Sequence, residues 1–486
     1  MQRAISCFGV ISLLFFYANF AHSQESAKPE PPPVAAPTPN QQNAPTNPDQ
    51  KPVPTQTPGA GTQVRTGSLV GSYEDLIRRL SALLADHQFM EMEKLLQDSD
   101  NAADGPTKLT QQQSQLYLGV LANRENKPQE SIRLLEPLVE QLKPDASGPE
   151  EKTLRKALAE DYLRAGDWAK AATAYQNLSN RGSLSPDEKS EIELPLKLLP
   201  LVAAYPPMTV EPGEPFALPY DRDALGLTDV PVFIDAQSHD WMLDPTAPFN
   251  LICRSTAKQI GLRISDQSAT VETITGRPMQ VHATLIPRFT LGTVTYRNMT
   301  AFVFDDADYY FPKSGYQVRG VLGYPAVSAL GSLTISSDAR IEVQPGDKGE
   351  KLTAGARFFL DGDQIVAALG KAGDERMFIV DASGQQTYLT SRYYAEHSGD
   401  FSNSKMQLLT TPSAQKRPPA PAYIAESVTL TVGATPVTFH YLQVLTQPLD
   451  AAAVDDTYGT LGMDALDELK SYTFDYRTMR FGVTTE

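Results

Sequence analysis

The chain has 486 residues, of which 41% are apolar, and a formal net charge of −16 at pH 7. Its length predicts several domains, and its apolar fraction suits soluble globular domains that each have a core. Because 58 acidic residues outnumber 42 basic ones, the protein repels phosphate backbones and anionic lipid surfaces, which argues against nucleic acid as a partner.

The N-terminal segment has the composition of a secretory signal peptide. Arg3 precedes an apolar run from Ala4 to Phe20, and Ala21-His22-Ser23 supplies small residues at the two positions that signal peptidase reads. We therefore expect residues 1–23 to be removed and the mature protein to be periplasmic or secreted, with no membrane span. A retained anchor is the alternative, but the run is short for a spanning helix and a polar segment follows it.

The cysteine content predicts a fold without disulfide bonds. The chain has two cysteines, Cys7 and Cys253, and Cys7 lies in the segment that we expect to be removed. A single remaining thiol cannot form an internal disulfide. The domains are therefore expected to be stabilised by their cores alone.

Residues 24–70 are expected to form a disordered linker. The segment is rich in Pro, Gln, Asn, Thr and Ala, as in Pro29-Glu-Pro-Pro-Pro33, and contains almost no large apolar residue. Such a segment buries too little surface to offset the entropy lost on ordering.

Residues 71–200 are predicted to form a helical domain. Leu76, Leu80, Leu83 and Leu84 recur at three- and four-residue spacing, which places them on one face of a helix. Two later stretches, 40 residues apart, share a pattern of small and large residues. The first contains Leu118, Gly119, Ala122, Ser131, Leu135 and Leu138, and the second contains Leu158, Ala159, Tyr162, Ala171, Tyr175 and Leu178.

This pattern resembles the tetratricopeptide repeat, whose usual period is 34 residues. The resemblance implies a short solenoid of paired helices, with a concave face that can hold a peptide or another protein. An ordinary helical bundle without repeat geometry is the alternative.

Residues 201–486 have the pattern of an all-β region that divides into 201–345 and 346–486. Short β-branched and aromatic runs are broken by Gly, Pro and Asp, which is typical of strands joined by turns. These runs include Val230–Ile234, Val271–Ile274, Phe289–Leu291, Val294–Tyr296 and Val428–Val432.

The two halves of this β region contain the same motifs in the same order. Each half has an apolar strand that ends at an aspartate, Asp244 or Asp381, and a later Gly-x-Leu-Gly motif that ends at Gly323 or Gly462. The interval from aspartate to final glycine is 79 residues in the first half and 81 in the second. The agreement in order and spacing indicates an internal duplication.

Each copy resembles one lobe of the retropepsin and pepsin-like aspartic proteases. In that family an apolar strand leads into Asp-Thr/Ser-Gly, a helix follows, and a later apolar-apolar-Gly turn packs beneath the aspartate. Here Arg254–Leu262 and Ser391–His397 are the helix-like stretches, and Val321–Gly323 and Thr460–Gly462 are the turns. The resemblance covers about residues 230–486. It implies a multi-domain chain in which the repeat-like helical domain precedes an all-β, bilobal acid-protease fold without a cofactor.

The resemblance also implies that Asp244 and Asp381 are a catalytic pair at the floor of a cleft between the lobes. Two carboxylates about 3 Å apart cannot both be ionised, so they share one proton. The ionised partner removes a proton from a bound water, while the protonated partner polarises the peptide carbonyl group. Gly323 and Gly462 are expected to support the pair from beneath.

The sequence departs from the family directly after each aspartate. The family's Asp-Thr/Ser-Gly becomes Asp244-Pro245-Thr246-Ala247 in the first copy and Asp381-Ala382-Ser383-Gly384 in the second. Pro245 and Ala382 lack the hydroxyl group that ties the two loops together in the family. Both copies carry a hydroxyl one residue later. We therefore hypothesise that Thr246 and Ser383, followed by Ala247 and Gly384, supply the missing contacts.

The remaining candidate residues favour structural roles. No metal-ligand spacing links the histidines His239, His282, His397 and His440. The acidic cluster Asp305, Asp306 and Asp308 lacks the ordered spacing of a calcium loop, so we expect a solvated turn and no metal. Tyr309, Tyr310 and Phe311 are expected to pack ordinarily. Gly276 is proposed as the tip of a hairpin that covers the cleft.

Two functions of different classes are consistent with these features. The first is peptide-bond hydrolysis by Asp244 and Asp381, with the helical domain recruiting a protein substrate or partner. The second is a catalytically inactive scaffold in which both domains bind peptides or proteins. The altered residues after the aspartates favour the scaffold, whereas the presence of both acidic residues favours the enzyme.

Overall fold

The computed structural model describes most of the chain from Tyr73 onward. The described ranges are 73–101, 108–142, 148–180, 184–272, 277–312, 314–347, 349–384, 386–402, 404–409, 420–449 and 455–485. The predicted signal peptide, the predicted linker and the proposed hairpin tip at Gly276 lie outside these ranges. None of the helices within them combines the length and apolar character needed to cross a membrane.

The part of the chain from Tyr73 to Val202, which we call the helical module, is built from helices in its described ranges. They are α2 (Tyr73–Ala85), α3 (Phe89–Asp100), α4 (Gln111–Arg124), α5 (Pro128–Glu140), α6 (Pro149–Arg164), α7 (Trp168–Asn180) and α8 (Pro186–Val202). Thr110 caps α4, and Ser185 and Glu188 form a capping box at the start of α8. The predicted helices are therefore present, whereas their assignment as tetratricopeptide repeats stays a prediction.

A small residue allows α4 and α5 to approach closely. A β-carbon at Gly119 would lie 2.3 Å from the Leu135 Cδ2 atom, so no larger side chain fits there. The Ser131 hydroxyl of α5 donates a hydrogen bond to the Gly119 carbonyl over 2.8 Å. The small-against-large pattern in the sequence thus accounts for the contact between these two helices.

We call the strands from Thr228 to Leu322 the first β unit. They are β4 (Thr228–Ile234), β5 (Gln237–Leu243), β6 (Leu251–Cys253), β7 (Ala269–Glu272), β8 (Pro278–Leu291), β9 (Val294–Phe304) and β12 (Gly320–Leu322). They form one sheet with β1 (Thr209–Glu211) and β3 (Asp221–Arg222), while β10 (Tyr310–Phe311) pairs separately with β11 (Tyr316–Gln317). Alternate residues of β4 are buried, as expected for a strand with one face on a core.

We call the strands from Ala356 to Leu461 the second β unit. They are β15 (Ala356–Asp361), β16 (Gln364–Leu369), β17 (Arg376–Val380), β18 (Tyr388–Leu389), β19 (Gln407–Leu409), β20 (Ala420–Val432), β21 (Thr435–Leu445) and β22 (Gly459–Leu461). The long antiparallel pair β20–β21 corresponds to β8–β9 of the first unit. The parallel pair β17–β22 corresponds to β5–β12.

The strands that follow the first β unit pair with the strands that follow the second, and this pairing joins the two units. They are β13 (Ser332–Ser336) and β14 (Arg340–Gln344) after the first unit, and β23 (Ser471–Asp475) and β24 (Arg480–Thr484) after the second, with β2 (Phe216–Pro219) at the edge. β13 and β23 are antiparallel, and the hydroxyl groups of Thr334 and Thr473 lie 2.8 Å apart across this pair.

Short helices occupy equivalent places in the two β units. Helix α9 (Arg254–Ile260) follows β6, and α11 (Ser391–His397) follows β18. Helix α10 (Tyr324–Ser328) and α12 (Met463–Leu466) follow the two Gly-x-Leu-Gly motifs. The order of elements therefore repeats in the same way as the sequence motifs.

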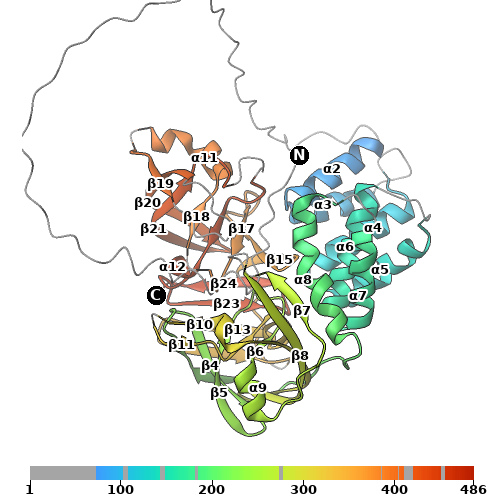
Figure 1. The fold of residues 1–486 in the computed structure, drawn as a ribbon. Coiled ribbons are helices and arrows are strands. Elements are labelled where there is room, and N and C mark those ends of the chain that lie inside the picture. Colours follow the sequence, from blue (N-terminus) through green and yellow to red (C-terminus); the bar gives the residue numbers. More distant parts are fainter. Residues whose placement is uncertain are drawn as a thin grey trace, which may run out of the picture.

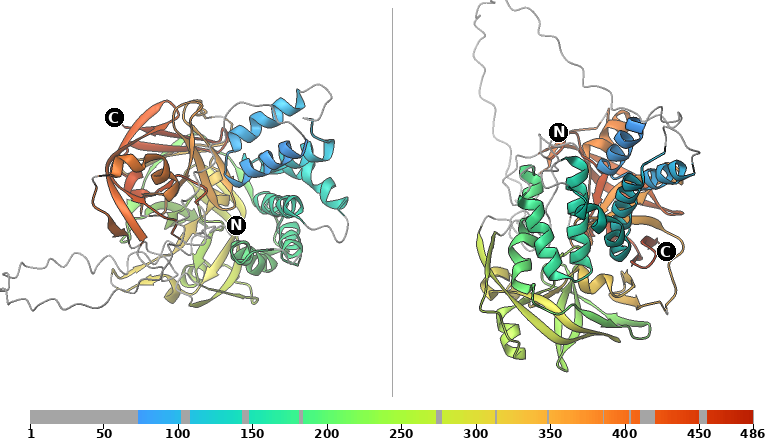
Figure 2. Two further views of the ribbon diagram at one scale, coloured as in Figure 1. Left: turned by 90° about the horizontal axis from the view of Figure 1, so that it is seen from above. Right: turned by 90° about the vertical axis from the view of Figure 1, so that its right-hand side faces the viewer.

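The helical module packs along one side of the β strands (Figures 1 and 2). Phe359 of β15 and Val366 of β16 are buried in one apolar cluster with residues of α2 and α3. The ring centroids of Phe89 and Phe359 lie 4.9 Å apart within this cluster. The helical module and the second β unit thus share a core.

A buried network of charges reinforces this interface at the end of β15. Asp361 lies 2.9 Å from the Arg124 guanidinium and 2.6 Å from the His87 Nε2 atom, while Arg124 also lies 2.9 Å from Glu160. Burial opposes the ionisation of Asp361, but Arg124, Lys156 and His87 together hold its pKa well below its usual value. Residues of α4 and α6, together with His87 between α2 and α3, therefore hold the end of β15 at Asp361.

Candidate active site

Asp244 and Asp381 occupy the same position in their β units. Asp244 follows β5, whose Leu243 pairs in parallel with Leu322 of β12, and its N–H donates to the Leu322 carbonyl over 2.9 Å. Asp381 follows β17, which runs parallel to β22, and its N–H donates to the Leu461 carbonyl over 2.9 Å. Each aspartate therefore begins a loop that is anchored to a neighbouring parallel strand.

The first loop folds back so that three donors reach one oxygen of Asp244. The N–H groups of Thr246 and Ala247 donate to Asp244 Oδ1 over 3.0 and 3.1 Å. The Thr246 hydroxyl lies 2.8 Å from the same oxygen. The hydroxyl thus reaches the carboxyl group although Pro245 stands directly after the aspartate.

The second loop repeats this arrangement around Asp381. The N–H groups of Ser383 and Gly384 donate to Asp381 Oδ1 over 3.2 and 2.7 Å, and the Ser383 hydroxyl lies 2.9 Å from it. A β-carbon at Gly384 would lie 2.2 Å from Asp381 Oδ2, so a side chain at this position would force the carboxyl group to move. The side chain at position 383 does not prevent the backbone from approaching the carboxyl group.

The two hydroxyl groups connect the loops across the interface between the β units. Thr246 Oγ1 and Ser383 Oγ lie 2.9 Å apart, and both side chains are buried. Hydroxyl groups two residues after the aspartates, instead of one, thus face each other as the sequence hypothesis requires. Each hydroxyl touches its own aspartate and the opposite hydroxyl at the same time.

This arrangement has too few hydroxyl protons for its contacts. Asp244 Oδ1, Thr246 Oγ1, Ser383 Oγ and Asp381 Oδ1 form a row of oxygens with contacts of 2.8, 2.9 and 2.9 Å. Each hydroxyl has one proton to donate, whereas three contacts need three protons. A proton on either Oδ1 atom completes this row, whereas a proton on an Oδ2 atom, from which a substrate carbonyl could accept it, leaves one of the three contacts without a hydrogen bond.

Burial favours retention of such a proton. Asp244 is fully buried, and its Oδ2 atom has no hydrogen-bond partner among the described residues. Burial raises the pKa of Asp244 to about 6, against the hydrogen bond from Thr246, and the neighbouring Asp381 charge raises it further. Burial also raises the pKa of Asp381, against the hydrogen bonds from its own loop. Because the carboxyl groups interact, they titrate as a pair.

The final glycines of the Gly-x-Leu-Gly motifs pack directly against the two loops. A β-carbon at Gly323 would lie 2.4 Å from the Phe249 carbonyl oxygen and 2.7 Å from that of Ala247. A β-carbon at Gly462 would lie 2.8 Å from the Gly384 carbonyl oxygen. Both positions therefore exclude a side chain, since the neighbouring atoms belong to the backbone.

Two further supporting residues are absent from the sequence-based prediction. The Asn250 side chain accepts a hydrogen bond from the Gly323 N–H over 3.0 Å, and the Thr387 hydroxyl accepts one from the Gly462 N–H over 2.8 Å. Both residues lie six positions after the aspartate of their unit. This equal offset is the signal that could have identified them, although an amide and a hydroxyl differ in chemistry.

The acidic cluster at 305–308 is engaged by protein groups. Asp305 forms an ion pair with Arg254, and Asp306 accepts a hydrogen bond from the Ser255 N–H over 3.0 Å. Asp308 lies 3.9 Å from Arg277. Within the described ranges, no group of three or more His, Cys, Asp or Glu side chains could hold a metal ion.

The remaining candidate residues lie on other elements than the aspartate loops, although Tyr309 lines a pocket together with Phe249. His239, His282 and His440 are on strands β5, β8 and β21, and His397 ends α11. The Tyr309 ring is buried against Phe304, with centroids 4.4 Å apart, whereas Tyr310 is exposed.

A match to a known protein family covers the first β unit. Residues 230–326 match the family model described as aspartyl protease. This aspartyl protease match includes Asp244, its loop and Gly323, and it ends before the second β unit. The chain is also similar to the crystal structure of a retropepsin-like aspartic protease from Rickettsia conorii, with 16% identity and a TM-score of 0.21. That similarity covers 28% of this chain and 93% of the other chain. Comparison with curated proteins gave no match.

Proposed function

We propose that residues 201–486 form a two-lobed aspartic protease domain that hydrolyses peptide bonds, with the two β units as its lobes. The observation that carries the proposal is the 2.9 Å contact between Thr246 Oγ1 and Ser383 Oγ, which brings the two aspartate loops together. The aspartyl protease match over residues 230–326 supports the same conclusion for the first lobe.

In this proposal Asp244 and Asp381 share one proton and act as general base and general acid. The ionised carboxyl group takes a proton from a water molecule, which then attacks the peptide carbonyl carbon. The protonated carboxyl group donates a hydrogen bond to the carbonyl oxygen as it gains negative charge. We assign the contact with the water molecule to Asp244 Oδ2, which has no partner among the described residues, because Oδ1 is already occupied by the loop.

A catalytically inactive, peptide-binding scaffold is the competing proposal. It is favoured by Pro245, which provides neither a hydroxyl group nor an N–H directly after the aspartate. The position of the Thr246 hydroxyl, 2.8 Å from Asp244 Oδ1, weakens this argument because the contact is restored one residue later.

We also propose that the helical module is a tetratricopeptide-like part of the protease that recruits a protein substrate or partner, through a surface other than the one at Arg124 and Lys156, which holds the second lobe. Arg124 and Glu160, on α4 and α6, face the β15–β16 turn of the second lobe. A peptide could bind there only by displacing Asp361. Export to the periplasm or the medium, after removal of residues 1–23, is part of the proposal and rests on the sequence alone.

The test is cleavage of a denatured protein mixture between about pH 3 and 7, the range in which a carboxyl pair titrates. Wild-type protein is compared with Asp244→Asn and with Asp240→Asn, which changes an exposed carboxyl group on the same strand. We expect cleavage by wild type and Asp240→Asn, inhibition by pepstatin, and none by Asp244→Asn. Absence of cleavage by wild type at every pH would favour the scaffold.

A further inference from the structure

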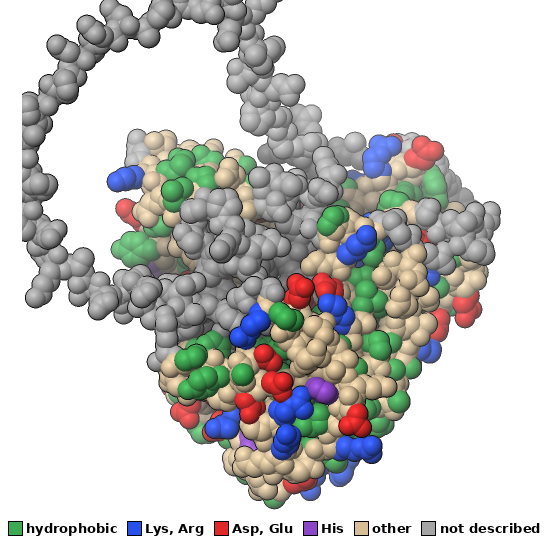
Figure 3. Space-filling view, in the orientation of Figure 1, with side chains coloured by type: hydrophobic (Ala, Val, Ile, Leu, Met, Phe, Trp, Pro, Cys, Tyr) green, Lys and Arg blue, Asp and Glu red, His purple; other side chains and the backbone are tan. Residues whose placement is uncertain are grey.

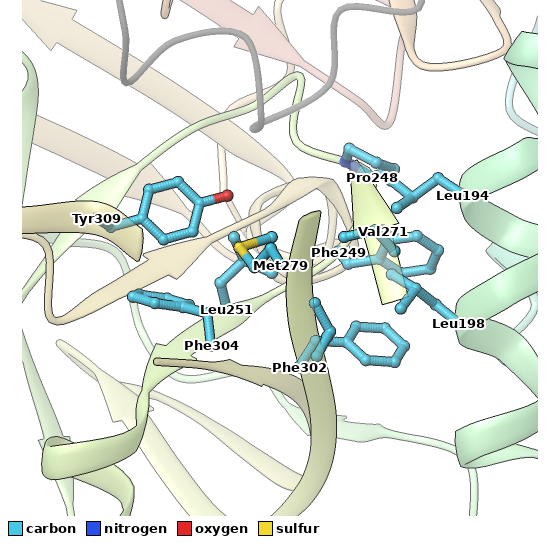
Figure 4. Close-up of a pocket in the computed structure, with 11 residues that line it drawn as sticks. Leu194, Leu198, Pro248, Phe249, Leu251, Val271, Met279, Phe302, Phe304 and Tyr309 are labelled. Carbon is cyan, nitrogen blue, oxygen red and sulfur yellow. The ribbon is translucent and has the colours of Figure 1, made fainter. Parts of the chain in front are cut away.

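An apolar pocket lies where helix α8 meets the first β unit. Leu194 and Leu198 extend from α8 toward Phe249 of the aspartate loop and Met279 of β8 (Figure 4). Val271 of β7 completes the same wall, and the lining is entirely apolar. The remaining cavity is about 30 Å³, room for a water molecule but not for an amino-acid side chain.

This pocket adjoins the loop that carries Asp244. Phe249 follows Asp244 by five residues, and its carbonyl oxygen packs against Gly323. The helical module contacts the first β unit at a second place near this loop. There the Tyr324 hydroxyl donates a hydrogen bond to the Asn126 side chain over 2.7 Å. The Tyr324 N–H in turn donates to the carbonyl of the aspartate loop at residue 247 over 2.7 Å.

The equivalent end of the second β unit is different. The residue five positions after Asp381 is Gln386, a polar residue that donates to Gln443 of β21 over 3.2 Å. Leu408, on the edge strand β19, is 71% exposed. The apolar cluster at this hairpin contains Ala420, Ala422, Leu445, Tyr388 and Leu449, and none of these described residues belongs to the helical module.

The outer edge of β7 indicates how a peptide substrate would approach Leu194 and Leu198 of α8. Among the described strands β7 pairs with β8 alone and ends its sheet, and α8 packs against it, so an extended peptide can add to β7 as a further strand only beyond the part that α8 contacts. Such a peptide advances about 3.3 Å per residue along the edge. A peptide that continued past Phe249 would have to displace Leu194 and Leu198.

We infer that α8 closes the Phe249 end of the substrate groove, so that the protein cleaves peptides near a chain end instead of in the middle of long chains. The inference rests on the proposed protease function and deepens it by naming the substrate class. Leu194 and Leu198 are specificity-determining residues in this account, because they limit how many substrate residues fit on one side of the cleaved bond. On the other side, along β19 and Gln386, the apolar cluster contains no described residue of the helical module, so we expect a longer segment to fit there.

The test uses synthetic peptides that share one cleavable central sequence and are extended by about four residues, roughly 13 Å, on one side or the other. For wild type we expect extension at only one side to lower kcat/KM, by about tenfold or more. This is the side on which the added residues would have to displace Leu194 and Leu198. The double variant Leu194→Ala, Leu198→Ala should recover cleavage of the extended peptide. Leu196→Ala, on the same helix but outside the pocket lining, should behave as wild type.

The outcomes separate the inference from the proposed function. Equal kcat/KM for both extended peptides in wild type would overturn the inference and leave the protease proposal intact. Absence of cleavage of every peptide, by wild type and by the double variant, would overturn both. The wild-type comparison decides the matter even if the double variant does not fold, which thermal unfolding would reveal.

Discussion

Thr246 and Ser383 place their hydroxyl oxygens 2.9 Å apart and thereby join the two aspartate loops. Each hydroxyl residue stands two positions after its aspartate, where the backbone N–H groups and the hydroxyl converge on a single carboxyl oxygen. Because the displacement is the same in both loops, the two hydroxyl groups still meet. A one-residue shift made in only one loop would separate them.

Replacing Thr246 by valine should weaken this connection at nearly constant volume. The change removes the hydroxyl donor to Asp244 Oδ1, which keeps its two N–H donors, and it removes the contact of the Ser383 hydroxyl with the opposite loop. Because one lost bond is to a carboxyl group, we expect a loss of about 1–3 kcal/mol in the free energy of unfolding. Activity should fall by about tenfold or more, because the orientation of the carboxyl pair depends on the loops. Thr246→Ser keeps the hydroxyl and serves as the control. Equal urea-unfolding midpoints and kcat/KM values for the two variants would contradict the assignment.

The protein should be more stable at about pH 5 than at about pH 7.5, because its buried carboxyl groups hold protons that the unfolded chain releases. The pKa of Asp244 is about 6 in the folded state against an ordinary 3.8. Burial likewise raises the pKa values of Asp161 and Asp229 to about 7. The folded state thus binds more protons across this window, and the free energy of unfolding decreases as the pH rises.

Urea unfolding across this pH range measures the effect. Asp244→Asn should show a shallower decrease than wild type, because the amide does not titrate. Stability that increases with pH across the window would contradict the pKa directions. Asp361, whose pKa is lowered, contributes stability that is lost only when the pH falls below its ordinary 3.8, and so it does not obscure the result.

Arg124→Met should strongly destabilise the contact between the helical module and the second β unit. The change leaves Asp361 and Glu160 without their buried guanidinium partner, which typically costs about 3–5 kcal/mol. Arg78→Met is the control, since Arg78 pairs with Asp75 at the surface with 75% of its side chain exposed. Its effect should stay within about 0.5 kcal/mol. The measurement is chemical unfolding of both variants. Similar unfolding midpoints for the two would show that the interface does not depend on this network of charges.

Local signals in the sequence were sufficient for the elements around the aspartates. The helix predicted at Ser391–His397 has these bounds in the structure, and the strand predicted at Val230–Ile234 lies within β4. The strand is recognisable from its own β-branched and aromatic residues, whereas the helix is expected from the resemblance of the surrounding motifs to the aspartic proteases.

The interface of the helical module could not be predicted in the same way. Arg124 and Asp361 are far apart in the chain, and neither differs from an ordinary surface charge when the sequence is inspected. Their burial follows from tertiary packing, in which Phe359 and Val366 are covered by α2 and α3. The suggestion that the concave face of the helical module binds a partner stays a prediction. Figure 3 shows that acidic and basic side chains lie interspersed on the visible face, so surface charge provides no further signal there.

Gly323→Ala should disrupt the support of the first aspartate loop. The added methyl group would lie 2.4 Å from the Phe249 carbonyl oxygen, and overpacking against backbone typically costs about 1–3 kcal/mol or more. Gly399→Ala is the control, because no atom lies within 4 Å of the added carbon. We expect a lower melting temperature and reduced kcat/KM for Gly323→Ala alone. Wild-type activity in that variant would show that the glycine is not needed beneath the loop.

The joint action of Asp244 and Asp381 is tested most directly by comparing kcat/KM for Asp244→Asn, Asp381→Asn and the double variant on one cleavable peptide. Residues that act as a unit are strongly non-additive, so each single variant should lose about 10³-fold or more and the double variant should lose no more than either. Substantial activity in Asp381→Asn, with none in Asp244→Asn, would contradict the pairing of one aspartate from each β unit.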